Sequence, residues 1–553
     1  MDHRRVAIFI ESDRAATNGP RQPSHRRLNP QHQRRRHMNA KRRAASLLLG
    51  VVLAACGGTP GAPTPVGSPR PAQSPLVAAM PTPQLMATPT PSAMGGPTPT
   101  DSSAPTTRLP RDCPLPAGAT RGWPVAGAGE PVFGVAGVVF AVLRRDYWDE
   151  TSYAIVHLDA LGRVKPGWPI CLLEPGGQVG LAVGGDGSLY ATICQPEAGG
   201  CVLHRFTVEG DEPPGWPLPL EGMTSCAAPL VASDGIVYAS CDVRSDDSHL
   251  LVGLTVAVDP NTGVRPGWPV DVGGQLEMAA DGTLYVRAWS GYPDVSPLTV
   301  TALDPNGTLR PGWPRSWPAD TFVRLAPDGT LTAWWYENRQ GGEGGFVADR
   351  TFYALFGADG RTLPGWPRTT GEAASAPGIG PDGTLYYDSV DGDVFALDRR
   401  GAVKRGWPVR GVGGSDLAVS PPFVSTDGSI LALDRSGVTA LNPGGGRLWS
   451  WGPGRSGSLS RCLGATPCAE RVDDPPVFEP DGTVYVRAYE WDADTGNSTA
   501  AIVALDERGN VRPGWPHRLP GGPTTPYVAP DGRLYLAGSK GLYALNSDGS
   551  RVK

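Results

Sequence analysis

The sequence has few of the residues and motifs on which catalytic sites usually depend. Only four histidines follow the first 40 residues, and they lie far apart in the chain: His157, His204, His249 and His517. No G-x-S-x-G or H-E-x-x-H motif occurs, and no phosphate-binding glycine loop stands out. We therefore assign no residue a catalytic, cofactor-binding or metal-binding role from the sequence.

Lysine is scarce as well, which bears on the possible partners. Residues 1–43 contain twelve Arg and Lys residues against three acidic ones, so the remainder of a chain with net charge −5 carries −14. Only four lysines follow residue 43. Nucleic-acid binding depends on basic side chains that neutralise phosphates, so we expect no nucleic-acid partner.

Helical periodicity is absent too, and the chain has a repeat instead. Eight Gly-Trp-Pro copies and a ninth, degenerate copy share a tryptophan at corresponding positions: Trp123, Trp168, Trp216, Trp268, Trp313, Trp366, Trp407, Trp449 (degenerate) and Trp515. Successive tryptophans are 41 to 66 residues apart. Such a period is typical of a repeat architecture.

Each repeat predicts four short β-strands. The Asp-Gly pair at 382–383 lies between two strand-like runs, which indicates a hairpin because Gly accepts a positive φ. Residues 384–387 and 394–397 form the second and third runs, an Asp-x-x-Gly turn follows at 398–401, and a fourth run leads to Gly-Trp-Pro. Because proline cannot donate to a ladder, we expect the fourth strand at the outer edge of its sheet. The pattern predicts an all-β fold, a closed β-propeller of four-stranded antiparallel blades.

The two ends of the repeat region predict that the propeller closes on itself. Residues 118–124 resemble a fourth strand without the three that precede it, and residues 545–553 stop where a Gly-Trp-Pro would follow. We expect the N-terminal strand to complete the last blade, which removes open sheet edges. This count gives nine blades; since propellers usually have four to eight, eight is the alternative.

The repeated tryptophans and aspartates have a structural explanation in every copy. An indole at the same position of each blade predicts packing between neighbouring blades, and an aromatic binding surface is the alternative. The repeated aspartates are expected to form turns, with ligand binding as the alternative.

A short apolar run near the start predicts an exported bacterial lipoprotein. Residues 38–43 form a basic head, and residues 44–55 are apolar or small but too few to span a bilayer. The junction from Leu53 to Cys56 resembles the lipobox of bacterial lipoproteins. We expect residues 38–55 to be a signal peptide and Cys56 to be lipidated, which would anchor an extracytoplasmic protein to the cell membrane.

The segments on either side of this signal are not expected to fold. Residues 1–37 are polar and Arg-rich, and we interpret them as a spurious upstream extension, with translation starting at Met38. Sixteen prolines lie between residues 57 and 120. We expect residues 56–117 to form a disordered Pro/Thr/Ser-rich tether and residues 118–553 to form the propeller.

The cysteine count agrees with an oxidising compartment. With Cys56 lipidated, eight cysteines remain, an even number. The expected disulfides, the last by elimination, are Cys226–Cys241, Cys194–Cys201, Cys462–Cys468 and Cys113–Cys171. Metal binding is the alternative, but no C-x-x-C pair or nearby Cys/His cluster supports it.

The repeat also resembles a known family. Residues 390–408, VDGDVFALDRRGAVKRGWP, resemble the repeats of pyrroloquinoline quinone (PQQ)-type propellers, and the likeness covers about residues 118–553. That superfamily includes quinoprotein dehydrogenases and the propeller lipoprotein of the outer-membrane β-barrel assembly machinery, which only binds partners and which this chain is similar to.

The resemblance bears on cofactors as well. The dehydrogenases stack the quinone on a ring formed by two adjacent cysteines, and this chain has none. Residues 492–497 resemble part of a calcium loop but lack the downstream Glu, so a polar hairpin tip is preferred. We expect no cofactor, with PQQ and calcium disfavoured.

Two functional hypotheses follow from these observations. The first is a membrane-tethered, non-enzymatic propeller that binds or scaffolds an extracytoplasmic protein, peptide or glycan. Its candidate surface is formed by the longest insertions, at residues 244–252, 335–350 and 452–474. The alternative is an exported quinoprotein-like oxidoreductase or carbohydrate-active propeller enzyme.

Overall fold

The fold comes from a computed structural model of the chain. The residues that the structure describes are 109–111, 113, 115, 121–134, 137–144, 152–172, 178–195, 200–244, 251–289, 297–318, 321–326, 328–340, 346–413, 421–434, 437–452, 469–472, 476–492, 497–518, 526–538 and 541–552. The predicted upstream extension, signal peptide, lipidation site and most of the tether lie outside these residues. His249, Cys462 and Cys468 lie outside them as well.

Short strands make up nearly all of the regular structure, and we group them into blades in chain order. Blades 1 to 3 contain β1 (Ala128–Phe133), β2 (Val139–Arg144), β3 (Ser152–Leu158), β4 (Ile170–Cys171); β5 (Gln178–Val183), β6 (Leu189–Gln195), β7 (Gly200–Phe206), β8 (Leu218–Leu220); and β9 (Met223–Cys226), β10 (Leu230–Val231), β11 (Val237–Arg244), β12 (Leu251–Asp259), β13 (Gly263–Val264). Blades 4 to 6 contain β14 (Gln275–Met278), β15 (Leu284–Trp289), β16 (Leu298–Leu303), β17 (Arg315–Trp317); β18 (Thr321–Leu325), β19 (Leu331–Gln340), β20 (Phe346–Phe356), β21 (Arg368–Thr369); and β22 (Gly378–Ile379), β23 (Leu385–Asp388), β24 (Val394–Leu397). Blades 7 to 9 contain β25 (Phe423–Val424), β26 (Ile430–Asp434), β27 (Gly437–Leu441), β28 (Arg447–Trp451); β29 (Ala469–Val472), β30 (Val477–Phe478), β31 (Val484–Asp492), β32 (Asn497–Leu505), β33 (His517–Arg518); and β34 (Tyr527–Val528), β35 (Leu534–Gly538), β36 (Gly541–Leu545).

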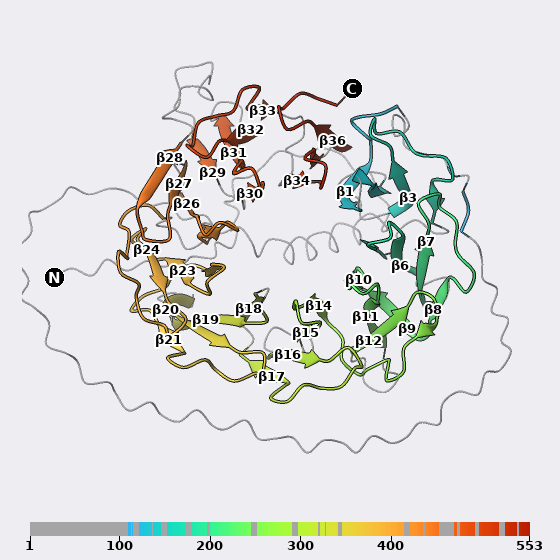
Figure 1. The fold of residues 1–553 in the computed structure, drawn as a ribbon, viewed down its shortest axis with the longest axis horizontal. Helices are drawn as coiled ribbons and strands as arrows, with labels where there is room; N and C mark the ends of the chain where they lie inside the picture. Colours follow the sequence, from blue (N-terminus) through green and yellow to red (C-terminus); the bar gives the residue numbers. More distant parts are fainter. Residues whose placement is uncertain are drawn as a thin grey trace, which may run out of the picture. The chain divides into compact units, whose positions relative to one another are not determined.

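Within the described residues these strands form nine separate antiparallel sheets, which follow one another round a ring (Figure 1). The prediction of a nine-bladed β-propeller is confirmed, and the eight-blade alternative is wrong. The described part of the chain contains no α-helix. None of its elements is therefore a helix long and apolar enough to cross a membrane.

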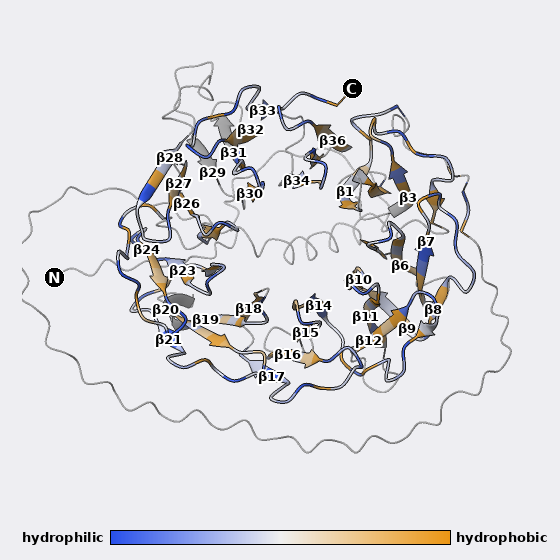
Figure 2. Cartoon of the chain, viewed as in Figure 1, coloured by the Kyte–Doolittle hydropathy of each residue, from blue (hydrophilic) through white to orange (hydrophobic). Residues whose placement is uncertain are grey.

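The middle strands of each blade are apolar on both sides because a neighbouring blade covers each side. In β23, Leu385 and Tyr387 pack towards blade 5, whereas Tyr386 packs towards blade 7. All four residues of β23 are buried. Such strands read as continuous apolar runs rather than alternating ones. Figure 2 shows apolar residues along many strands and polar residues at many of the connecting turns.

The outermost strand differs from its prediction. We expected it to run up to Gly-Trp-Pro, but in most blades the longer pairing lies after the proline, as in β4, β8, β17 and β21. In blades 1, 4 and 5 the residues before Gly-Trp-Pro form single bridges to the third strand, such as Leu303 to Leu309, whereas in blade 3 they form the two-residue strand β13. The motif interrupts the outer edge because its glycine has a positive φ and its proline lacks an N–H donor.

Each Gly-Trp-Pro motif contacts the turn between the third and fourth strands of the next blade, which has the sequence Asp-x-x-Gly in blades 1, 4 and 6. We call this contact the clasp. All eight clasp glycines have φ between 85° and 97°. At seven of them a Cβ would lie within 2.7 Å of a carbonyl oxygen in the next blade's turn; at Gly312 it would lie 2.0 Å from the Asp359 oxygen. Glycine is therefore required for its backbone conformation and for the close approach of two blades.

The clasp tryptophans connect their own blade to the next. In its own blade Trp313 packs edge-on against Tyr285, with ring centroids 5.4 Å apart, and six other clasp tryptophans have an aromatic partner at the same position. Trp313 Nε1 also donates to the Ala358 carbonyl of the next blade's turn at 3.0 Å. Five more clasp indoles, those of Trp123, Trp168, Trp216, Trp366 and Trp407, make the corresponding bond at 2.9–3.3 Å.

The degenerate ninth copy keeps part of this contact. Trp449 lies in β28, and a Cβ on Gly509 of the next blade's turn would meet its ring at 2.6 Å. Gly307 has the same relation to Trp268, and Gly360 to Trp313. The described tryptophans therefore belong to the blade interfaces.

The aspartates of the repeat cap turns. The Asp382 carboxylate accepts the backbone N–H of Thr384, and the Asp398 carboxylate accepts those of Arg400 and Ala402. Each of these bonds closes a local turn of the Asx type. In the same blade Lys404 Nζ lies 3.0 Å from Asp382 Oδ2, which ties the two turns together.

The ring closes through the N-terminal segment, as predicted, although with a different residue. Val125, just after the first Gly-Trp-Pro, exchanges two backbone hydrogen bonds with Leu542 of blade 9, at 2.8 and 3.0 Å. Arg551 supplies the single bridge to Leu545 that other blades make before their Gly-Trp-Pro. Trp123 then clasps blade 1 through the Ala160 carbonyl. Chain residues far apart in sequence thus build the last blade together.

Replacing a clasp glycine by alanine tests the requirement for close approach. Gly312→Ala introduces a strained φ, which costs about 1–3 kcal/mol, and also a collision with the Asp359 carbonyl. Gly215→Ala is the matched control, because Gly215 has a similar φ but nothing lies within 4 Å of its Cβ position. We expect Gly312→Ala to lower the urea midpoint clearly more than Gly215→Ala. Equal midpoints would contradict the clasp.

Candidate functional site

The two faces of the ring carry different connections. Because each blade is an antiparallel meander, its first and third turns lie at one end and its strand 2–3 connection lies at the other. Arg310 and Asp281 belong to the third and first turns of one blade and form an ion pair at 3.1 Å, which is consistent with both turns lying at the same end. We call the two ends the turn face and the hairpin face.

Among the described residues, three blades have the longest ladders between their second and third strands, with eight, ten and nine residue pairs against seven in blade 2. These are β11–β12 of blade 3, β19–β20 of blade 5 and β31–β32 of blade 8. The predicted insertion at 335–350 is therefore not mainly a loop: residues 335–340 and 346–350 continue the ladder of blade 5, with Glu337 opposite Arg350. Of the insertion at 244–252, the ends at Arg244, Leu251 and Val252 pair in the ladder of blade 3, and residues 245–250 lie outside the described residues. Residues 453–468, the larger part of the third insertion, lie outside the described residues, while β29 from its end pairs with β31.

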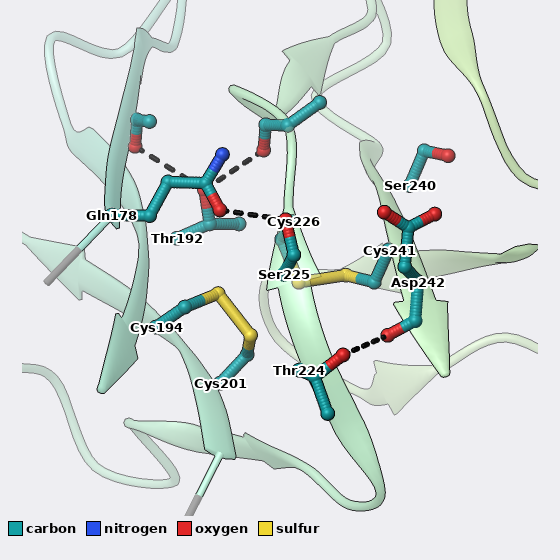
Figure 3. The surroundings of a disulfide bond; sticks show 12 residues. Gln178, Thr192, Cys194, Cys201, Thr224, Ser225, Cys226, Ser240, Cys241 and Asp242 are labelled. Atoms are coloured by element: carbon teal, nitrogen blue, oxygen red, sulfur yellow. Dashed lines mark hydrogen bonds between the residues drawn. A yellow bond between two sulfur atoms is a disulfide. The ribbon is translucent and has the colours of Figure 1, made fainter. Parts of the chain in front are cut away.

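Two of the predicted disulfides reinforce the hairpin face where blades 2 and 3 meet (Figure 3). Cys194–Cys201 joins β6 to β7, and Cys226–Cys241 joins the additional strand β9 to β11. Ser225 Oγ of β9 donates to Gln178 Oε1 of blade 2 at 2.7 Å. Thr192 Oγ1 of blade 2 donates to the Ala227 carbonyl at 2.9 Å. Blades 2 and 3 are therefore joined here by polar contacts as well as by packing.

The third disulfide, Cys113–Cys171, attaches a segment that we call the strap: Leu109, Pro110, Arg111, Cys113 and Leu115. Leu109 is buried in the interface of blades 1 and 2, and the Pro110 carbonyl accepts the N–H of Cys171 at 2.8 Å. Arg111 donates to the carbonyls of Gly167 and Gly210, which belong to the clasp between these blades.

The strap contacts a second blade interface as well. Leu115 packs on the apolar cluster shared by blades 9 and 1. Among the described residues, Leu109 to Leu115 thus already contact the propeller, within the segment that we had assigned to the tether.

A small recess lies between the inner strands of blades 4 and 5. Its polar wall is formed by Gln275, Glu277 and Arg287, and its apolar wall includes Val323 and Leu325. Arg287 Nη2 lies 3.3 Å from Glu277 Oε1, and its Nη1 donates to the Val323 carbonyl at 2.8 Å. The polar groups of the recess are thus engaged with one another and with the scaffold.

Three carboxylates gather on the hairpin side of blade 6. Glu372 lies in the connection between β21 and β22, and Asp391 and Asp393 lie in the β23–β24 turn. Desolvation, followed by the negative charges of Asp391 and Asp393, raises the pKa of Glu372. Asp393 also lies 3.5 Å from Arg410. Nothing in the sequence indicated this group, because Glu372 belongs to a different connection from Asp391 and Asp393.

The described histidines are structural. His157 is buried, and its Nδ1 lies 2.9 Å from the Val208 carbonyl of the next blade. Burial lowers the pKa of His157, so the ring is held neutral and Nδ1 carries the proton that it donates. His204 and Glu212 form a buried pair at 2.7 Å. His517 packs edge-on against Trp515, and burial together with Arg551 lowers its pKa.

Comparisons with known proteins do not assign the chain to a family. No family model matches the sequence, and no curated protein matches it. Similar solved structures include hydrazine synthase of Kuenenia stuttgartiensis (15% identity, 57% of this chain and 93% of that chain, TM-score 0.31). A streptogramin B lyase is also similar (11% identity, 75% and 92%, TM-score 0.29), as is a structure of the Dos1 propeller (10% identity, 76% and 92%, TM-score 0.38). At these identities and TM-scores no activity can be transferred.

The strap disulfide should contribute more to stability than the hairpin disulfide of blade 2. Cys113–Cys171 closes 58 residues and Cys194–Cys201 closes 7. In the chain-entropy account the longer loop gives a difference of about 2 kcal/mol. We expect Cys113→Ser/Cys171→Ser to lower the urea midpoint more than Cys194→Ser/Cys201→Ser does. The reverse order would show that the strap adds little to the fold.

Burial of neutral His157 should make the fold sensitive to mild acid. Because its folded pKa is lowered, its contribution is complete above the ordinary value of 6.5 and is lost as the pH falls towards the folded pKa. Asn at this position keeps a donor near Nδ1 but does not titrate. We expect the drop in urea midpoint between pH 7.5 and 5.5 to be smaller in His157→Asn than in the wild type. An identical drop in both proteins would contradict this assignment.

Proposed function

We propose that this chain is an extracytoplasmic propeller lipoprotein of the PQQ-type repeat family, tethered to a bacterial membrane through Cys56. In this proposal it acts without catalysis, as a binding or scaffold module for a protein, a peptide or a glycan. The signal-like residues 38–56 support the extracytoplasmic location, and the repeat pattern supports the family. The observation that carries the binding role is that blades 3, 5 and 8 have the longest hairpins and that these hairpins all extend on one face of the ring.

The division between the two faces supports this role. On the turn face, aspartates and basic residues are occupied with one another and with backbone groups, as in the Asp382–Lys404 and Asp281–Arg310 pairs. On the hairpin face, the connection between the second and third strands of a blade can vary in length without disturbing the clasps. Function is carried more often by such loops than by the scaffold that positions them.

An exported enzyme is the second candidate, quinoprotein-like or carbohydrate-active. The observation that favours it is Glu372, whose pKa is raised beside Asp391 and Asp393. A carboxyl with a raised pKa near other carboxylates is the arrangement that a general acid requires. Stable retention of PQQ after incubation with the quinone and Ca²⁺, seen in the absorption spectrum, would favour the quinoprotein form of this candidate.

Site-specific photocrosslinking in the cells that make the protein tests the binding role. A photoreactive residue at Glu337 reports on the hairpin face, and one at Arg361 of the same blade reports on the turn face. Both side chains are exposed, at 55% and 85%. We expect discrete crosslinked species from position 337 and none of comparable yield from position 361. Equal yields, or none from position 337, would overturn the assignment of the partner to the hairpin face.

A further inference from the structure

Two disulfides of neighbouring blades lie against each other and bring four sulfur atoms into one group. The Sγ atoms of Cys194, Cys201 and Cys226 all lie within 4.8 Å of one another, and Cys241 is bonded to Cys226 (Figure 3). We call these residues the four-sulfur cluster. Among the described residues no other cysteine joins it.

The surroundings of the cluster are closed and apolar. The four cysteines are between 1% and 3% exposed and belong to one packed cluster with Leu203, Leu220, Met223 and Ala239. A closed shell without solvent is typical of structural metal sites, whereas catalytic sites keep one position open.

The position of the cluster depends on the additional strand β9. Strand β9 pairs with β11 outside the usual four-strand path and also touches blade 2. It places Cys226 beside the two cysteines of blade 2. An ordinary four-stranded blade would leave the Cys194–Cys201 disulfide alone.

Contacts that do not involve sulfur hold the same geometry. The Ser225–Gln178 bond at 2.7 Å and the Thr192–Ala227 bond at 2.9 Å join blade 3 to blade 2. Thr224 Oγ1 donates to the Asp242 carbonyl at 3.2 Å, which keeps β9 on β11. The backbone positions of the four cysteines should therefore persist when both disulfides are reduced.

We propose that reduction converts the four-sulfur cluster into a tetrathiolate site for Zn²⁺ or a similar soft divalent cation, which joins blades 2 and 3. Each disulfide accepts two electrons and two protons from a dithiol, which itself becomes a disulfide. The four thiols then release four protons, and four metal–sulfur bonds form. Zn–S bonds of about 2.3 Å place tetrahedral sulfurs about 3.8 Å apart. Cys226 Sγ, which lies within 4.8 Å of the sulfurs of Cys194 and Cys201, needs to approach them only slightly. Side-chain rotation then separates each bonded pair and turns Cys241 Sγ towards the metal.

This inference does not depend on what the hairpin face binds. Its consequence is that the interface between blades 2 and 3 has two chemical states. The oxidised state has one disulfide within each blade, and the reduced state has a metal shared between the two blades. Two equivalents of a disulfide oxidant, each reduced to a dithiol, would accept the four electrons, release the metal and restore both disulfides.

Cobalt binding to the reduced full chain tests the site. The protein is reduced with dithiothreitol, freed of it without oxygen and titrated with Co²⁺, whose tetrahedral thiolate complexes absorb in the near-ultraviolet and the visible. We expect one equivalent to bind and Zn²⁺ to displace it. Cys226→Ser/Cys241→Ser should abolish the bands, and the matched control Cys113→Ser/Cys171→Ser should keep them.

Alkylation of the reduced wild-type protein gives a readout that needs no variant. With Zn²⁺ present, iodoacetamide should label Cys194, Cys201, Cys226 and Cys241 at least about tenfold more slowly, while Cys113 and Cys171 keep their rate. The proposal would be overturned if no thiolate–cobalt bands appeared or if all six cysteines were protected alike. Loss of the β-sheet circular dichroism on reduction that Zn²⁺ does not restore would overturn it as well.

Discussion

The clasp between Gly-Trp-Pro and the next blade's turn is the contact on which the ring depends. It combines a glycine that permits backbone approach, an indole that packs on its own blade and a hydrogen bond to a carbonyl of the neighbour. The same contact recurs between blades 9 and 1 through Trp123 and Ala160. Because every blade is held by both neighbours, closure adds an interface of the same kind and leaves no blade with an exposed apolar side.

Around this frame, blades 1 to 3 carry additional covalent links. The strap fixes the chain to blades 1 and 2 before it reaches Val125, the residue that completes blade 9. A pull applied to the chain ahead of Leu109 would therefore meet the strap disulfide and the Arg111 contacts before the closing bridge. The two other disulfides of the described residues lie close by, at the interface of blades 2 and 3. Among the described residues, the covalent links are therefore concentrated where the N-terminal segment joins the ring.

Much of the fold could be predicted from the sequence, because the turn and strand preferences that determine it are local and recur in every repeat. Asp-Gly turns, apolar runs and the spacing of the tryptophans predicted the blades, their number and closure by the N-terminal segment. The disulfide partners followed from the even number of cysteines that remain after Cys56 and, for Cys226 and Cys241, from their symmetric placement about a turn. The split outer strand was missed, since the pattern does not reveal that residues after Pro169 or Pro314 pair better than those before the motif. The long hairpin of blade 5 was mistaken for a loop, because residues 335–350 lack the alternation of a half-buried strand.

What the sequence determined by itself is the repeating unit: four strands, two Asp-capped turns and a Gly-Trp-Pro, each set by local backbone preference and by burial on both sides. What only the tertiary structure decided is which side chains of different blades meet. The four-sulfur cluster and the contact of the strap with the clasp between blades 1 and 2 join residues from separate repeats or from outside them. Such neighbours are fixed by the rotation from one blade to the next, a global quantity that no single stretch of sequence contains.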